Sequence, residues 1–205
     1  KLVKAKERQY KWLLNKLILD PIKTRQKNRS EFTLGDISII KKGQQLSVVD
    51  MISDGQYYVL NGGISPSGYT NKWNTPANTI SISEGGNSCG YVNFNLASFW
   101  AGGHCYTIQN ISNKADVKYL YYYLKAVEEK IMSLRVGSGL PNIQKKDIDS
   151  LPVVLPPLDV QVSIAAVLSD SQQEMSLLEK AIILQKSQIQ ALMQKLLTGE
   201  WRVKA

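Results

Sequence analysis

The stretch that decides the fold begins at Leu155-Pro156-Pro157-Leu158-Asp159-Val160-Gln161 and ends at Leu192-Met193-Gln194-Lys195-Leu196-Leu197-Thr198-Gly199. Between these two motifs the sequence predicts a helix of about forty residues. A diverged copy of the second motif lies near the N-terminus. A shift of 179 positions aligns Leu13-Leu14-Asn15-Lys16-Leu17-Ile18 with residues 192–197. A repeated element separated by the length of one domain indicates pseudo-symmetry.

The predicted helix carries an apolar seam with the spacing of a coiled coil, in which apolar residues alternate at intervals of three and four. One row contains Leu168, Met175, Ile182, Ile189 and Leu196, and the other contains Ser171, Leu178, Gln185 and Leu192. In the N-terminal copy the same register places Val3, Tyr10 and Leu17 on one row and Lys6 and Leu13 on the other. An ordinary amphipathic helix packed on its own domain is the alternative. The residues that we expect in helix pairing are Leu13, Leu17, Leu168, Met175, Leu178, Ile182, Ile189, Leu192 and Leu196.

The sequence between Glu31 and Ser112 is mostly strand-like. Short apolar or alternating runs bounded by turn residues occupy 32–40, 57–60, 78–83, 90–95 and 105–109, and the turn at 84–88 predicts a hairpin. After Ser112 and Asn113, which we expect to be N-caps, apolar positions from Val117 to Leu134 predict a helix packed on one face. The expected fold class is therefore α+β: a compact β-rich domain with a packed helix, followed by a long coiled-coil-forming helix.

Several short words near the C-terminus carry a family resemblance through their order and spacing. They are Leu140-Pro141-Asn142-Ile143, Asp147-Ile148, Leu151-Pro152-Val153 and Leu155-Pro156-Pro157-Leu158, followed by Gln161, Ile164, Leu168 and the second motif at 192–199. Together they resemble the specificity (S) subunit of type I restriction-modification systems. The resemblance covers about 60 residues at the C-terminus and, more weakly, the first twenty.

This resemblance implies a domain plan, because in that family a target recognition domain is followed by a long conserved helix and the unit usually occurs twice. Residues 1–20 then correspond to the tail of a central conserved helix, 21–30 to a basic linker and 31–157 to the target recognition domain. Residues 158–199 correspond to the distal conserved long helix, for dimerisation and spacing, and 200–205 to a tail. A second recognition half is expected from a missing N-terminal half or from a second copy of this chain as a homodimer.

The resemblance also implies a function and its partners. It predicts a non-catalytic subunit that binds one half of a bipartite double-stranded DNA target and recruits methyltransferase and restriction/translocase subunits. S-adenosylmethionine, ATP and Mg are expected only in those partners, where methylation and cleavage would occur, so no cofactor or metal is expected in this chain. The sequence contains no run of 18 apolar residues and no signal-peptide pattern, which favours a cytoplasmic location without membrane contact.

Basic residues are concentrated at the N-terminal end of the chain. The formal net charge is +8, and residues 1–29 hold ten basic and two acidic side chains, which accounts for the whole excess. The remaining residues carry 15 charges of each sign, so a DNA-binding face there requires segregated charges and not a bulk excess. The basic segment 21–29 is either a phosphate-tracking segment or a solvated linker.

Two segments carry the side chains expected at a DNA interface. Segment 61–74 is rich in glycine and amides, and amide and basic side chains are the groups that hydrogen-bond base edges. The second segment is Gly137-Ser138-Gly139 and the residues after it. The alternatives are an irregular loop with Trp73 in the core and a structural connection held by Pro141. The candidates for phosphate contact are Lys41, Lys42, Lys72, Arg135, Lys145 and Lys146. The residues that we predict to bind DNA are Lys41, Lys42, Tyr69, Asn71, Lys72, Asn74, Ser138, Asn142, Gln144 and Lys145.

Motifs of the expected partner enzymes are missing from the sequence. There is no Gly-x-x-x-x-Gly-Lys-Ser/Thr loop for ATP and no Asn/Asp-Pro-Pro-aromatic element of an amino-methyltransferase. His104, Cys89 and Cys105 have no recognised zinc spacing, and the two cysteines are most simply interpreted as buried thiols. Two alternatives to a DNA specificity subunit stay open: a coiled-coil scaffold that does not bind DNA, and a small hydrolase or transferase with a site around His104.

Overall fold

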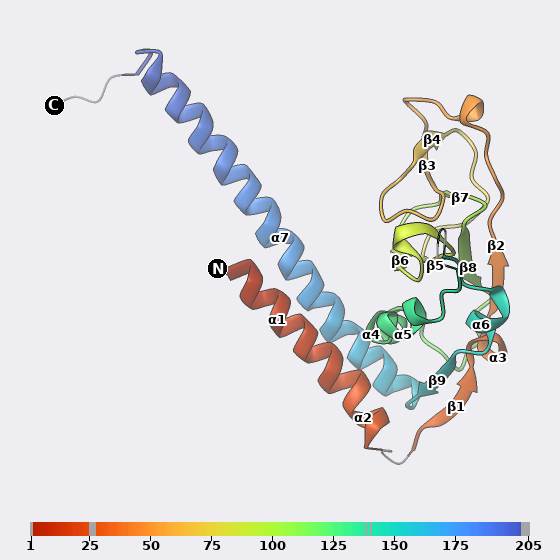
Figure 1. The fold of residues 1–205 in the computed structure, drawn as a ribbon. Coiled ribbons are helices and arrows are strands. Elements are labelled where there is room, and N and C mark those ends of the chain that lie inside the picture. Colours follow the sequence, from red (N-terminus) through yellow and green to blue (C-terminus); the bar gives the residue numbers. More distant parts are fainter. Residues whose placement is uncertain (1, 25–27, 138, 140, 202–205) are drawn as a thin grey trace.

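A computed structural model describes residues 2–24, 28–137, 139 and 141–201. The chain consists of a helical arm and a β-rich domain, which diverge from a shared base (Figure 1). The model confirms the predicted fold class, including the long C-terminal helix. No helix within the described ranges is both long and apolar enough to cross a membrane.

Helix α7, Leu158–Leu197, forms the arm together with α1, Leu2–Leu14. At about 1.5 Å per residue, the 40 residues of α7 make a rod of roughly 60 Å. Helix α1 lies antiparallel to α7 and continues through a π-helical turn, Asn15–Leu19, into α2, Asp20–Lys23. Helical conformation therefore extends beyond residue 20, into the segment that the sequence analysis assigns to a linker.

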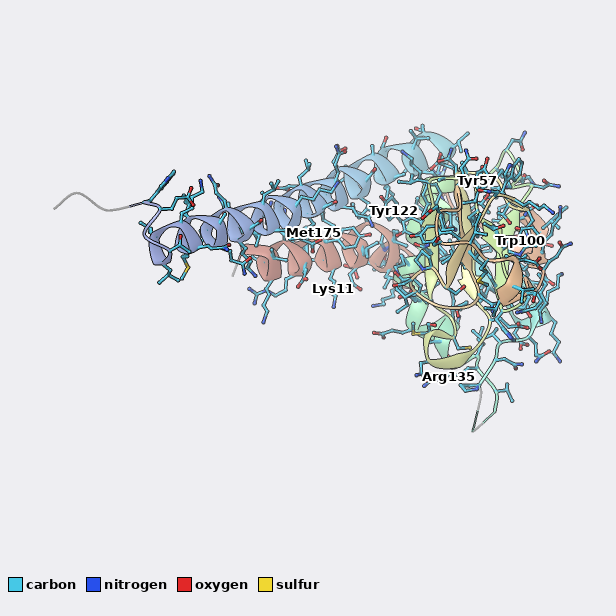
Figure 2. The ribbon with its side chains drawn as sticks, turned by 90° about the horizontal axis from the view of Figure 1, so that it is seen from above. Lys11, Tyr57, Trp100, Tyr122, Arg135 and Met175 are labelled. Atoms are coloured by element: carbon cyan, nitrogen blue, oxygen red, sulfur yellow. The ribbon has the colours of Figure 1, made fainter. Side chains whose placement is uncertain are left out.

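The side of α1 that packs against α7 carries the residues of the N-terminal heptad register. Lys6 lies within this register, and its Nζ is 2.7 Å from Glu174 Oε1 on α7. Figure 2 shows the two helices side by side, with Lys11 labelled on α1 and Met175 on α7. The residues of the register are all partly buried: Val3, Lys6, Tyr10, Leu13 and Leu17.

The seam of α7 changes from buried to exposed along the helix. Leu168 is fully buried in the main core, and Met175, Leu178 and Ile182 are partly buried. Beyond them the exposed seam residues are Ile189, Leu192 and Leu196. The proximal half of the seam is therefore covered within the chain, and the distal half faces solvent.

The described residues of the domain form three small sheets. The four-stranded antiparallel sheet has the order β2 (Ile39–Lys42), β8 (Cys105–Gln109), β5 (Thr79–Ser83) and β6 (Val92–Asn95). In the three-stranded sheet, β3 (Tyr57–Leu60) pairs antiparallel with β4 (Gly68–Thr70) and parallel with β7 (Trp100–Ala101). Strand β1 (Ser30–Thr33) pairs with β9 (Pro152–Leu155) at the base of the arm.

Short helices connect these sheets, and α4 joins the domain to the arm. Helix α4, Val117–Ala126, packs against both α7 and β6, and α5, Glu128–Ser133, follows it directly. The remaining short helices are α3 (Leu34–Ile37), α6 (Lys145–Asp149) and the 3-10 turns η2 (Val48–Asp50) and η3 (Gly86–Ser88). Arm and domain share one core, because Ile18, Ala165 and Leu168 lie in the same cluster as Ile80, Tyr119 and Ile148.

The structure confirms the predicted hairpin, since β5 and β6 pair antiparallel across the turn. Two other local expectations were wrong. The single strand predicted over 32–40 is interrupted by α3, because Thr33 and Asp36 form a capping box that starts a helical turn. The N-cap of α4 is Asp116, whose carboxylate accepts from the backbone N–H of Tyr119 at 2.8 Å, and not Ser112 or Asn113.

Candidate nucleic-acid interface

The first predicted recognition segment folds into the β3–β4 hairpin and the turn after β4. Tyr69, Asn71 and Lys72 are all exposed there, and the Asn71 side chain makes one contact, in which Oδ1 accepts from Gln56 N at 3.2 Å. Trp73 is 50% exposed, so the alternative that buries its ring in the core was wrong. The hairpin therefore presents an aromatic ring, an amide and an ammonium group to solvent.

Asn74 has a different role from its neighbours, because its amide is turned into the domain. Its Nδ2 donates to Ala101 O at 3.0 Å, and its Oδ1 accepts from Ala101 N at 2.7 Å. Thr75 Oγ1 also donates to Asn74 Oδ1 at 2.9 Å. Both ends of the amide are thus used in holding the turn against β7, and hydrogen bonds to a base edge would have to displace them.

A hollow of about 220 Å³ brings together residues that are distant in the sequence. Its lining includes Lys41 and Lys42 at the end of β2, and Asn74 from the first predicted recognition segment. The rest of the lining is Gly43, Gln44, Thr75, Thr107 and Gln109. Two of the predicted phosphate-contact residues and part of the predicted recognition segment therefore line one polar concavity.

The second predicted segment lies next to the end of β5. Asn142 exchanges both backbone hydrogen bonds with Val136, and its Oδ1 accepts from Gln144 Nε2 at 3.1 Å. Lys145 Nζ lies 2.7 Å from Asp149 Oδ2, across one turn of α6. Ser138, also a candidate, lies outside the described residues. Asn142, Gln144 and Lys145 are exposed but already engaged with their own segment.

Glu84 connects the second segment to Lys42 and is not among the residues predicted from the sequence. Its backbone C=O accepts from Ile143 N at 2.9 Å, and its Oε1 lies 2.6 Å from Lys42 Nζ and accepts from Tyr106 Oη at 3.0 Å. Burial raises the pKa of Tyr106, and its hydrogen bond to Glu84 raises it further. Glu84 lies in the predicted hairpin turn, and its partners come from strands that only the fold brings near it.

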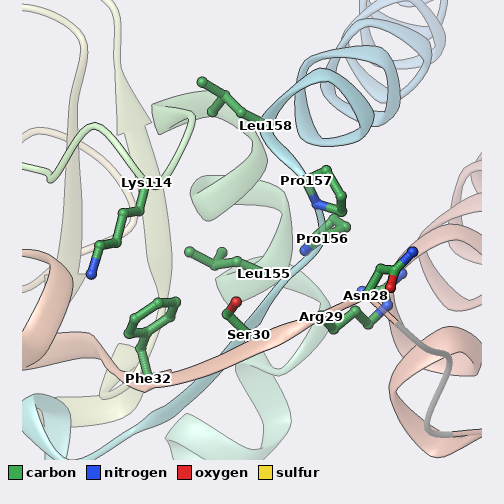
Figure 3. Close-up of a pocket in the computed structure, with 9 residues that line it drawn as sticks. All are labelled: Asn28, Arg29, Ser30, Phe32, Lys114, Leu155, Pro156, Pro157 and Leu158. Carbon is green, nitrogen blue, oxygen red and sulfur yellow. The ribbon is translucent and has the colours of Figure 1, made fainter.

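Another hollow, of about 600 Å³, lies where the arm meets the domain (Figure 3). Arg29 and Lys114 are its basic residues, and Phe32 and Leu155 contribute from β1 and β9. Lys114 Nζ lies 4.9 Å from the centroid of the Phe32 ring, which is within the range of a cation–π contact. This hollow contains none of the predicted DNA-binding residues, so we treat it as part of the junction.

The two cysteines are buried free thiols. Burial raises the pKa of Cys105 to about 12, and it also raises the pKa of Cys89. Thiols of this kind are poor nucleophiles near neutral pH. Within the described part of the chain, no three His, Cys, Asp or Glu side chains are grouped so that they could hold a metal ion.

The fold and the candidate surface define a class of protein in which a compact domain presents polar loops and is mounted at the base of a long, partly unpaired helical arm. Residues 26–185 match the family model described as the type I restriction modification DNA specificity domain. The chain belongs to this family.

Known proteins of the same kind are similar to the chain over part of their length. A type I specificity subunit of Mycoplasma pneumoniae is 42% identical over 129 residues, which cover 62% of this chain and 34% of that protein. A type I specificity subunit of Mycoplasma genitalium is 35% identical over 127 residues, covering 62% and 33%. The chain therefore spans about a third of the length of these relatives.

Solved structures give the same result for the fold. The crystal structure of the type I restriction-modification system S subunit from M. genitalium matches with a TM-score of 0.75 and 31% identity, covering 82% of this chain and 46% of that one. The HsdS subunit from Thermoanaerobacter tengcongensis matches with a TM-score of 0.66 at 20% identity, covering 95% and 51%. The second match supports the fold alone.

Proposed function

We propose that this chain recognises one half of a bipartite double-stranded DNA target. The observation that carries this proposal is the joint exposure of Tyr69, Asn71 and Lys72 on one hairpin, in a chain of the specificity-domain family. An amide can hydrogen-bond base edges, an ammonium group can contact guanine or phosphate, and an aromatic ring can pack against a base or sugar. The hairpin supplies these groups, and the sheets behind it fix their position.

The domain has no net excess of positive charge, so its attraction for DNA must come from the local positions of its lysines. Lys41 and Lys42 are exposed at the hollow that Asn74 also lines, and Lys72 follows β4 in the neighbouring sheet. Exposed cations attract the DNA backbone locally even when the domain as a whole has no excess charge. We assign phosphate contacts to these lysines and base contacts to Tyr69 and Asn71.

The arm sets the distance between this domain and a second recognition half. Ile189, Leu192 and Leu196 form an exposed apolar row on the distal part of α7, where α1 does not cover it. A helix with the same heptad pattern would bury this row by knobs-into-holes packing. The second half is either a second copy of this chain or another recognition unit of a longer subunit.

The chain acts as the non-catalytic part of a larger complex in this proposal. Methyltransferase subunits and a restriction/translocase subunit would supply methylation, cleavage and their cofactors. In this proposal residues 31–157 form the recognition domain and residues 158–199 form the spacer helix.

The proposal is tested by reconstituting the chain with its methyltransferase and S-adenosylmethionine, followed by sequencing of modified bases. We expect methylation at one fixed motif made of two half-sites. A complex that modifies DNA without a shared motif would contradict sequence recognition. A chain that assembles with other proteins but shows no preference among oligonucleotides would instead be a scaffold.

Two matched substitutions separate the assigned roles of neighbouring residues. Lys72→Ala should weaken binding to all sequences and lower the slope of log K against log salt by about one. Asn71→Ala should relax the preference at one half-site, with a discrimination loss of about 1–3 kcal/mol. The control is Lys130→Ala, which removes an exposed lysine from α5, outside the β3–β4 hairpin. Identical effects of Lys72→Ala and Lys130→Ala would contradict the assignment.

A further inference from the structure

A buried carboxylate lies beneath two exposed cationic side chains beside the candidate interface. Glu84 follows β5, Lys42 ends β2 and His104 immediately precedes β8. The Glu84 side chain is only 7% exposed, whereas those of Lys42 and His104 are 52% and 63% exposed. Lys42 Nζ is 2.6 Å from Oε1, and His104 Nδ1 is 3.4 Å from Oε2. Each carboxylate oxygen therefore lies within ion-pair distance of a different nitrogen.

The backbone around His104 is fixed by contacts to two loops. Its C=O accepts from Glu84 N at 2.9 Å, and its N–H donates to Asn61 Oδ1 at 3.2 Å. Gly62 adopts a φ of +83°, and a Cβ added there would lie 2.8 Å from His104 O and 2.9 Å from His104 Cβ. Only glycine fits such a close approach at a positive φ without strain. The backbone that carries the His104 imidazole is thus held in place next to Glu84.

One contact in this cluster is incomplete. Tyr106 and Lys42 both donate to Glu84 Oε1, but among the described residues Oε2 has no hydrogen-bond partner. The 3.4 Å separation from His104 Nδ1 is within the range of an ion pair but longer than most N–H···O hydrogen bonds. Buried acceptors without a donor are rare in folded proteins, so this oxygen marks a place where a donor is needed.

His104 can meet this need while also contacting a ligand. In the imidazolium form both ring nitrogens are donors, so Nδ1–H can face Oε2 while Nε2–H is left for a second acceptor. Lys42 Nζ has three donors and is half exposed, so it can share that acceptor. An acceptor that suits two cations at the surface of a DNA-binding domain is a phosphate oxygen.

We propose that Lys42 and His104 bind one backbone phosphate of the DNA and that Glu84 positions both of them. His104 is a DNA contact in this proposal, and Glu84 is a positioning residue that does not itself reach the DNA. The inference rests on the proposed function, because it adds a phosphate site to the same recognition surface.

The test measures the salt dependence of DNA binding for four forms of the chain: wild type, His104→Gln, Glu84→Gln and the double variant. The probes are a short duplex that carries the motif found by methylation sequencing and a random-sequence duplex pool, titrated between about 50 and 200 mM salt. We expect His104→Gln to lower the slope of log K against log salt by about one on both probes. In the Glu84→Gln background the same substitution should leave the slope unchanged, because the imidazole is no longer held.

Each outcome of this cycle supports or overturns the inference. No change of slope for His104→Gln in the wild-type background would remove His104 from the interface. An equal decrease in both backgrounds would mean that Glu84 does not position it. If Glu84→Gln does not fold, His104→Lys replaces it as the test, since a permanent cation at 104 should preserve the wild-type slope. Lys118→Gln, an exposed lysine on α4, is the matched control. A wild-type chain that prefers no motif would contradict the proposed function, which is a separate result.

Discussion

Gln161 Oε1 accepts a hydrogen bond of 2.9 Å from the backbone N–H of Asp116, which joins the start of α7 to the N-cap of α4. Gln161 Nε2 donates to Lys114 O at 2.9 Å and to Pro156 O at 2.8 Å. All of these contacts belong to a side chain that is only 1% exposed. A single amide therefore links the start of α7 to the chain before α4, beside the core that arm and domain share.

Gln161→Ala should destabilise the chain by about 2–4 kcal/mol, because it leaves a part-buried N–H and two carbonyls, one of them buried, without a partner. The free energy of unfolding from urea denaturation measures this effect. Gln188→Ala, at an exposed position of the same helix, is the control and should change stability by less than about 0.5 kcal/mol. Equal effects of the two substitutions would show that the amide contacts do not support the junction.

Sequence periodicity was sufficient to predict the arm, because the packing of a long helix follows a regular spacing. It also predicted the hairpin over 78–95, where alternation and turn residues agree. The strands β4 and β7 were not predicted, since Gly68–Thr70 and Trp100–Ala101 are too short to show a pattern. Glu84 was missed because its partners, Lys42 and Tyr106, reach it only through strand pairing. Local patterns predict helices and hairpins, whereas a site assembled from separate strands depends on the complete fold.

Asn71 and Asn74 were both predicted to contact DNA, but they differ in the structure. Asn71 is exposed to solvent, whereas the Asn74 amide supports the turn. Asn74→Ala should lower the free energy of unfolding by about 1–3 kcal/mol, because its amide makes two hydrogen bonds to the backbone of Ala101. Asn71→Ala, the matched control, should change it by less than about 0.5 kcal/mol, because that side chain is exposed and makes one contact. Urea denaturation of both variants gives the comparison. The reverse order of effects would make Asn71 the structural residue of the turn.

The capping box of α3 should make part of the free energy of unfolding depend on pH in the acidic range. The backbone N–H of Thr33 donates to the Asp36 carboxylate at 2.7 Å and holds the pKa of Asp36 below its usual value of 3.8, with a smaller contribution from the Thr33 side chain. Because the folded-state pKa is lowered, the contribution is complete above the unfolded-state pKa and is lost as the pH falls through the folded-state pKa.

The stability difference between wild type and Asp36→Ala should therefore be constant above about pH 5 and should shrink towards zero in stronger acid. Urea denaturation across this pH range measures the difference. Asp50→Ala removes an exposed carboxylate from η2 and is the control. A difference between wild type and Asp36→Ala that stays constant down to the acid limit would mean that the charge of Asp36 does not contribute.

The distal seam of α7 should control association without supporting the fold of the single chain. Ile189 and Leu192 are exposed, so Ile189→Lys with Leu192→Lys should leave the melting temperature nearly unchanged. Where a second copy of the chain supplies the second half, the same pair should abolish concentration-dependent association, because two buried lysines would face the partner helix in a seam that requires apolar residues. Sedimentation analysis measures the mass, for which the single chain is 22.9 kDa. Gln188→Lys with Gln190→Lys adds the same charge to exposed polar positions of the helix and should preserve association.

Leu168→Ala should show the opposite behaviour: it should cost about 2–5 kcal/mol of stability because Leu168 is buried in the shared core. Association that survives lysines at 189 and 192 would place the contact with the second half elsewhere on the chain.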